Sequence, residues 1–372
     1  MIEVSRKADE TYRIVCCILL ISLNLMFELN NTQWSIFFKA ISIISFTIIC
    51  FLFVYFSFKY KFKTQDLVVL TVLLVTEVIC FIFHDNEALL LLIAAVLFFF
   101  LKEIDIINIY LWTLIIVFFI TATLSFLGVL PLTADGFYVL GFGYKNRIGF
   151  ILFSICLYTF FIIKNRYSNK LTTVIGYLLL FLTIFLEQAL QDRTAMVLLL
   201  LLLVIYSTHI FKFNNKFFAI LIISLPLILI AISLFLSFNL TRFEWINKLN
   251  ELLSLRISLW NNDWSMYNLT IFPQQLNSYF SYITNYGQNV SVTALDGYFA
   301  LGMLQHGIIF FMISIYSLMH MLFINLEDIN DEKELLMCIT VIFILYSFSE
   351  NIPAVSYLCF LFPTAFSLKS SR

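Results

Sequence analysis

The chain has 372 residues, of which 62% are hydrophobic and only 12% are charged, with a formal net charge of −1. A soluble domain is typically about a quarter charged, so this composition excludes a water-exposed globular surface and predicts an integral membrane protein. The near-neutral balance gives no indication of a nucleic-acid partner.

Apolar runs long enough to cross a bilayer recur along the chain. A spanning helix needs roughly 20 apolar residues, and these runs lack the alternation of a membrane barrel. We therefore predict an all-α bundle forming a single integral membrane domain over residues 1–372. The first run is followed by Glu28-Leu-Asn-Asn instead of a cleavage site, which predicts an uncleaved span. The twelve predicted spans are 12–28, 33–57, 66–83, 87–101, 106–128, 148–163, 171–187, 194–211, 217–238, 297–323, 335–349 and 354–368.

The distribution of basic residues orients these spans. With the N-terminus in the cytoplasm, the cytoplasmic side receives fifteen of the 22 lysines and arginines, the outer side receives six, and Lys39 falls within a span. Cytoplasmic loops are enriched in basic residues. We therefore predict a multi-pass membrane protein with both termini in the cytoplasm.

Two outer loops are longer than turns, over about 128–147 and 239–296. The second contains an amphipathic stretch whose polar side carries Asn250 and Arg256, and it predicts a short helix along the membrane surface or against the bundle. Six large apolar residues recur in it at helical spacing: Trp245, Leu249, Leu252, Leu253, Leu259 and Trp260.

The outer basic residues differ in kind, because four of the six are arginines. A guanidinium matches the oxygens of a phosphate in a bidentate way. Arg147, Arg193 and Arg256, each beside a predicted helix end, are therefore candidates for binding an anionic head group. The alternative is that they anchor helix ends at the membrane interface.

Several stretches stand in a recognisable order on the outer face. They are Gly143-Tyr-Lys-Asn-Arg-Ile-Gly149, Gln191-Asp-Arg-Thr-Ala195, Leu249-Asn-Glu-Leu-Leu-Ser-Leu-Arg-Ile257 and Leu295-Asp-Gly-Tyr298, with Gly307-Ile-Ile some ten residues later. This order resembles the O-antigen and capsular polysaccharide polymerases of the Wzy type, which share a bundle and a large outer loop with the O-antigen ligases. The resemblance covers residues 140–310. Two positions depart from the pattern: Lys145 and Arg147 flank Asn146, and Gly297 replaces the usual Asn.

The resemblance implies a glycosyltransferase of the bacterial inner (plasma) membrane, for which we expect no cofactor. Four scattered histidines, no Cys in polar segments and no Asp-x-Asp on the outer side argue against a metal. Such an enzyme transfers a glycan from an undecaprenyl-pyrophosphate-linked oligosaccharide to a hydroxyl of a second lipid-linked repeat unit, within the membrane lipid and with a chain-length regulator as a candidate partner. Arg193 and Arg256 would stabilise the charge on the leaving pyrophosphate. The matched positions also make Arg147, Asn146, Asn250 and Tyr298 candidates for substrate binding.

A general base must accept the proton of the acceptor hydroxyl, and Asp296 is the first candidate. It directly precedes a predicted span at the outer face, where the ligases commonly have a His. The alternative for Asp296 is the N-cap of that helix, a common role for Asp. Glu187 and Asp192 are other candidates for the base, or partners of Arg193.

Ionisable residues within a membrane commonly have functions, and Glu77, in the middle of a predicted span, is the most interesting of those present. The others are Lys39, His209, His306 and His320. A lone interior His is more often a packing residue than a ligand.

The main rival function is a transporter or flippase, which would use helices interrupted by Gly or Pro. Only 10 Gly and 5 Pro occur, and no paired interruption is visible. A ligase would differ from a polymerase only in its acceptor.

Overall fold

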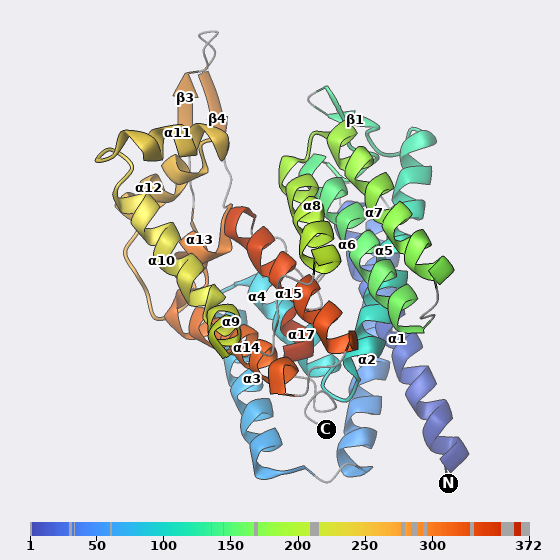
Figure 1. The fold of residues 1–372 in the computed structure, drawn as a ribbon. Coiled ribbons are helices and arrows are strands. Elements are labelled where there is room, and N and C mark those ends of the chain that lie inside the picture. Colours follow the sequence, from blue (N-terminus) through green and yellow to red (C-terminus); the bar gives the residue numbers. More distant parts are fainter. Residues whose placement is uncertain are drawn as a thin grey trace. The chain divides into compact units, whose positions relative to one another are not determined.

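The computed structural model describes residues 2–29, 32, 34–59, 62–134, 136–143, 145–166, 170–208, 216–276, 280–283, 289–292, 296–327, 331–350 and 361–365. Helix dominates this part of the chain, which confirms the all-α prediction (Figure 1). The chain divides into two compact units. The first comprises Met1–Val69, Leu97–Ile210 and Ser367–Arg372, and the second comprises Leu70–Val96 and Phe211–Phe366.

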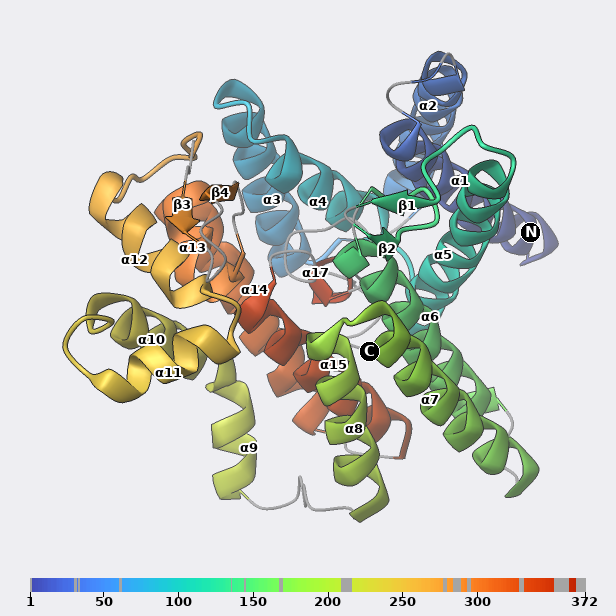
Figure 2. The ribbon, with the colours of Figure 1, turned by 90° about the horizontal axis from the view of Figure 1, so that it is seen from above.

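The first unit is a set of long helices that pack mainly on their neighbours in sequence. α1 packs on α2 and α5, α5 packs on α6, and α6 packs on both α7 and α8. In Figure 2, α6 lies between α5 and α7. Its elements are α1 (Ile2–Glu28), α2 (Trp34–Lys59), α5 (Glu103–Phe126), β1 (Thr133–Ala134), β2 (Phe137–Tyr138), α6 (Lys145–Arg166), α7 (Lys170–Leu190) and α8 (Arg193–Thr208).

The second unit holds the large predicted loop and shorter helices around α14. α10 packs on α12 and α13, and α14 packs on α9, α13, α15 and α17. Its elements are most of α3 (Thr64–Ile82), α4 (Asn86–Leu97), α9 (Lys216–Ile223), α10 (Leu225–Phe238), α11 (Glu244–Leu252), α12 (Arg256–Met266), β3 (Phe280–Ile283), β4 (Asn289–Val292), α13 (Tyr298–Gln305), α14 (Gly307–Glu327), α15 (Asp331–Ser349) and α17 (Leu361–Ala365).

Each unit also carries one small antiparallel hairpin in a predicted outer loop. β1 pairs with β2, with Thr133 opposite Tyr138. β3 pairs with β4, with Phe280 opposite Val292 and Ile283 opposite Asn289.

Six helices in the described residues are long and apolar enough to cross a membrane, and a bent pair would raise the number to seven. The six are α1, α2, α5, α6, α7 and α14, while α4 and α8 are shorter apolar helices. These helices support a membrane protein, whereas the count of twelve spans stays a prediction. The predicted span 354–368 lies outside the described residues except for α17.

Three elements expected to be continuous are interrupted. The predicted span 217–238 forms α9 and α10, which bend by 59° at Ser224. The predicted span 297–323 forms α13 and α14, because Gly307 adopts a left-handed φ of 74° between them. The amphipathic stretch around Trp245–Trp260 forms α11 and α12, separated by left-handed residues at Ser254 (φ 55°) and Leu255 (φ 65°).

Candidate functional site

The break between α11 and α12 buries two residues that the amphipathic pattern placed on a polar side. Leu255 is left-handed, so α12 starts in a new direction at Arg256. Asn250 and Arg256 are buried, whereas Trp245 and Leu252 are exposed. The side of the stretch that carries Asn250 and Arg256 therefore faces the interior, and the break shifts the helical phase only for the residues of α12.

Asn250 fastens the two helices to each other. Its side-chain nitrogen donates to Oγ of Ser258 at 2.7 Å, and its Oδ1 accepts from the backbone N–H of Ser258 at 3.0 Å. Both hydrogen bonds close the bend between α11 and α12, which places Asn250 in a structural role.

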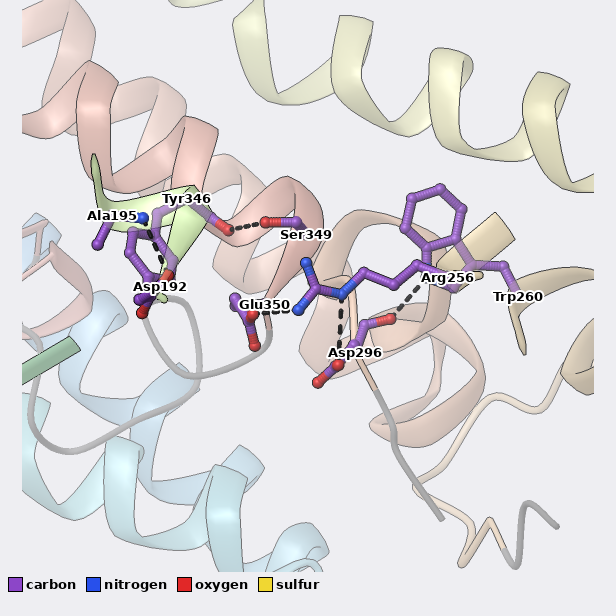
Figure 3. Close-up of polar contacts among 8 residues, drawn as sticks. All are labelled: Asp192, Ala195, Arg256, Trp260, Asp296, Tyr346, Ser349 and Glu350. Carbon is purple, nitrogen blue, oxygen red and sulfur yellow. Dashed lines mark hydrogen bonds and ion pairs between the residues drawn. The ribbon is translucent and has the colours of Figure 1, made fainter. Parts of the chain in front are cut away.

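Arg256 lies between two carboxylates from distant parts of the second unit (Figure 3). Its Nε is 3.4 Å from Oδ2 of Asp296, and its Nη2 forms an ion pair with Glu350 at the end of α15. The side chains of Arg256 and Glu350 are 11% and 4% exposed, whereas that of Asp296 is 29% exposed. Asp296 is thus the member of this cluster that a substrate could reach from solvent.

The backbone of Asp296 is also fixed by a hydrogen bond. The indole Nε1 of Trp260 donates to the carbonyl oxygen of Asp296 at 2.6 Å (Figure 3). Gly297 follows with a left-handed φ of 94°, and a Cβ there would lie 2.6 Å from the same Nε1. Glycine is therefore required where the resemblance expected Asn, because any side chain would collide with Trp260.

The N-cap position of α13 belongs to Gly297, and no side chain caps this helix. The alternative of Asp296 as the N-cap is therefore wrong. Its carboxylate instead contacts Arg256.

The electrostatics of the cluster follow from burial and from one shared cation. Burial raises the pKa of Asp296, and the nearby Arg256 only partly offsets this effect. Burial alone would lower the pKa of Arg256, but Glu350 and Asp296 together raise it, so the guanidinium stays charged. With both carboxylates ionised the cluster carries one net negative charge, which favours accepting a proton over attracting an anion.

Tyr298 directly follows this cluster but points into the core. It is fully buried at the first turn of α13, and its hydroxyl bonds to Oγ of Ser314 on α14. The described contacts of Tyr298 thus join two helices.

Asn146 and Arg147 lie in the first turn of α6 in the first unit. Arg147 is buried, with Nη2 2.6 Å from Oε1 of Glu28 and its guanidinium carbon 4.4 Å from the ring centroid of Phe27. Its Nε is buried without a hydrogen-bond partner among the described residues. Asn146 is half-buried beside it. The ion pair with α1 favours an anchoring role for Arg147.

Arg193 is the first residue of α8 and is exposed. The preceding Asp192 is buried, and its Oδ1 accepts from the backbone N–H of Ala195 at 3.1 Å, which caps the helix (Figure 3). Glu187 is also buried, and neither carboxylate oxygen has a hydrogen-bond partner among the described residues. The expected pairing of Glu187 with Arg193 is therefore not seen in this part of the chain.

The predicted site residues thus fall into two sets. Asn250, Arg256, Asp296 and Tyr298 belong to the second unit, where Arg256 and Asp296 are in contact. Asn146, Arg147 and Arg193 belong to the first unit.

Sequence reasoning missed Glu350, which lies 94 residues along the chain from its partner Arg256. The one available signal was an acidic residue directly after the apolar run 335–349. No known family model, curated protein or solved structure matches this chain.

Proposed function

We propose that the chain is a membrane glycosyltransferase of the polysaccharide polymerase type. It would extend a glycan carried on undecaprenyl pyrophosphate at the outer face of the inner membrane. The observation that carries this proposal is the cluster of Asp296, Arg256 and Glu350, in which a partly exposed carboxylate of raised pKa is held by a buried arginine.

The reaction requires one bond to form and one to break. The acceptor hydroxyl oxygen attacks the anomeric carbon of the donor glycan, and the bond from that carbon to the pyrophosphate oxygen breaks. The electron pair leaves with the pyrophosphate, and the hydroxyl proton passes to Asp296. A raised pKa suits Asp296 to this step, because a general base works best when its pKa approaches the working pH.

Arg256 would serve this reaction first by positioning. Its two carboxylate contacts fix the direction of Asp296 and occupy the guanidinium. To bind the leaving pyrophosphate as the sequence predicted, Arg256 would have to exchange one carboxylate for the phosphate. Arg193, which is exposed, is free of that requirement.

The test is the pattern of lipid-linked and surface-attached glycan in a deletion strain. We expect loss of long chains while single repeat units are still attached, with recovery by the wild-type gene and no recovery by the Asp296→Asn variant at matched abundance. Loss of every attached chain would instead support a ligase or a flippase.

A flippase is the second candidate, and the interrupted helices favour it. α9 and α10 bend by 59°, and α13 and α14 separate at Gly307, whereas the sequence had indicated no paired interruption. Transporters commonly place their sites at such breaks. A flippase defect leaves the lipid-linked unit on the cytoplasmic leaflet, whereas a polymerase or ligase defect leaves it on the outer leaflet.

The proposal also includes an orientation for the chain, with both termini in the cytoplasm and residues 239–296 outside. Reporter fusions after Lys216 and after Leu249 should then report opposite compartments. Cytoplasmic signals from both would contradict the orientation and the outer-face site with it.

A further inference from the structure

The junction between α13 and α14 is built around the left-handed Gly307 (Figure 1). A Cβ at this position would lie 2.4 Å from the carbonyl carbon of Phe272 and 2.7 Å from the carbonyl oxygen of Ile271. The segment Thr270–Gln274 therefore packs its backbone directly against the break. Only glycine permits both the conformation and the close approach.

This segment satisfies backbone groups that the break leaves free. The N–H groups of Ile308 and Ile309 donate to the carbonyls of Thr270 (3.0 Å) and Ile271 (3.3 Å). The backbone and side-chain N–H groups of Gln274 donate to the carbonyls of Gln305 and Leu304, both at 3.0 Å. An interrupted helix in a membrane protein needs such partners, so Thr270–Gln274 acts as a clasp across the junction.

A buried acid–base pair lies at the same junction. His306, the residue between α13 and α14, is 0% exposed, and its Nδ1 is 2.7 Å from Oδ2 of Asp85. Asp85 precedes α4, and its Oδ1 also accepts from the backbone N–H of Ala88 at 3.2 Å. The clasp also contacts the chain just before Asp85, because the ring of Phe272 stacks on that of Phe83 with centroids 4.9 Å apart.

The second nitrogen of His306 has no hydrogen-bond partner in the part of the chain that the structure describes. When Asp85 is ionised its carboxylate can only accept, and Nδ1 of His306 then donates to it. Nε2 of neutral His306 is then an acceptor, and it is buried with no hydrogen-bond partner among the described residues. A packing histidine would have both nitrogens satisfied or one exposed to solvent, and within the described residues His306 shows neither arrangement.

We propose that His306 and Asp85 form a proton-binding site, in which a proton taken up at Nε2 of His306 is balanced by the carboxylate of Asp85. The site is separate from the Arg256 cluster and goes beyond the proposed glycan transfer. Because His306 lies within the junction, gain or loss of this proton alters the backbone contacts that the clasp makes with α13 and α14.

The other groups around the pair carry no charge near neutral pH or are exposed. Asp85 acts electrostatically on Cys80 of α3 and Tyr298 of α13, and both are neutral in that range. The rings of Tyr298 and Phe310 lie 6.3 and 5.2 Å from that of His306. The clasp contributes no charged side chain, and the adjacent His84 is exposed.

The proposal is tested by ¹⁵N NMR of the full chain labelled at its four histidines, with His306 assigned from the His306→Gln variant. In the wild-type protein we expect Nδ1 of His306 to keep its proton while Nε2 gains one as the pH falls from about 8 to 5. Asp85→Asn removes the counterion, so half-protonation of Nε2 should require about a tenfold higher proton concentration. His84→Asn is the matched control and should leave the His306 signal unchanged.

Hydrogen exchange gives the second readout. After correction for intrinsic exchange, peptides covering 268–276 and 304–312 should change protection over the same pH range in the wild type and not in His306→Gln. A single protonation state of Nε2 throughout the range would overturn the proposal, and this measurement needs only the wild-type protein should a variant fail to fold. Identical titration in wild type and Asp85→Asn would overturn it as well.

Discussion

Two buried arginines, one in each compact unit, meet their carboxylates in different ways. Among the described residues Arg147 forms an ion pair with Glu28, and both side chains are nearly inaccessible, at 11% and 5% exposure. Arg256 has the same exposure but contacts two carboxylates, and one of them, Asp296, remains 29% exposed. The first arrangement is closed and neutral, whereas the second is open on one side and carries an excess carboxylate.

This difference separates an anchor from a positioning group. A buried one-to-one pair has no accessible charged group to offer a substrate, so its loss should appear in stability. A cation that holds an accessible carboxylate controls where that carboxylate points, so its loss should appear in the reaction rate. The predictions below test this division.

The largest effect is expected for Asp296→Asn, which removes the proposed base without changing its size. General-base catalysis contributes about 10²–10⁴-fold, so chain extension should fall by that factor at matched protein abundance. Because burial raises the pKa of Asp296, wild-type activity should fall with acid at a pH above the ordinary carboxyl value of about 3.9. The residual activity of Asp296→Asn should not show this decrease in acid. The same decrease in acid in the variant would contradict the assignment of Asp296 as the general base.

The next effect is expected for the two arginines that the sequence assigned to the leaving group. Arg193→Ala should lower chain extension by about 10²–10³-fold, as loss of one donor to a developing anion does. Arg256→Ala should lower it as well, because Asp296 loses the cation that fixes its direction. Arg256→Lys should also be impaired, because a lysine cannot contact two carboxylates through a planar fork. The readout is glycan chain length against protein level.

Arg242→Ala is the control for these variants, since Arg242 is exposed and lies 5.6 Å from the ring of Phe243 without belonging to the cluster. Long chains in both Arg193→Ala and Arg256→Ala, with normal insertion, would make these residues interface anchors and leave the proposed transfer without its cations.

The sequence predicted the helices better than their interruptions. The predicted spans 33–57 and 171–187 match α2 and α7 closely, because an apolar run of sufficient length has few alternatives in lipid. The break at Leu255 was invisible, since a left-handed leucine is set by tertiary packing and not by its own preference. Gly307 did offer a local signal, but within an apolar run glycine alone does not indicate a break.

The site was predicted in part for similar reasons. Motif order brought out Arg256 and Asp296, and the structure places them in contact. Glu350 could not be found, because its partner is remote in sequence and no motif surrounds it. Asn250 and Tyr298 stood in the same motifs, yet their described hydrogen bonds join helices, which a motif cannot distinguish from substrate contacts.

A smaller effect on activity is expected at Arg147, where stability should change instead. Glu28→Gln or Arg147→Met leaves one buried charge unpaired, which typically costs about 3–5 kcal/mol, while the double variant should recover most of it. Thermal unfolding in detergent measures the change, and chain extension at matched abundance should stay near the wild-type level. Loss of chain extension in the stable double variant would instead support the predicted role of Arg147 in substrate binding.

The smallest effect is expected for Asn250→Ala, which removes both hydrogen bonds between α11 and α12 and leaves the backbone N–H of Ser258 without its acceptor. An unsatisfied buried group costs about 1–3 kcal/mol, so the unfolding temperature should fall modestly. Because the bend sets where Arg256 begins α12, a small loss of activity should accompany it. Asn247→Ala on the exposed side of the same helix is the control. Equal stability of the two variants would mean that core packing of Ile257 and Trp260 holds the bend without Asn250.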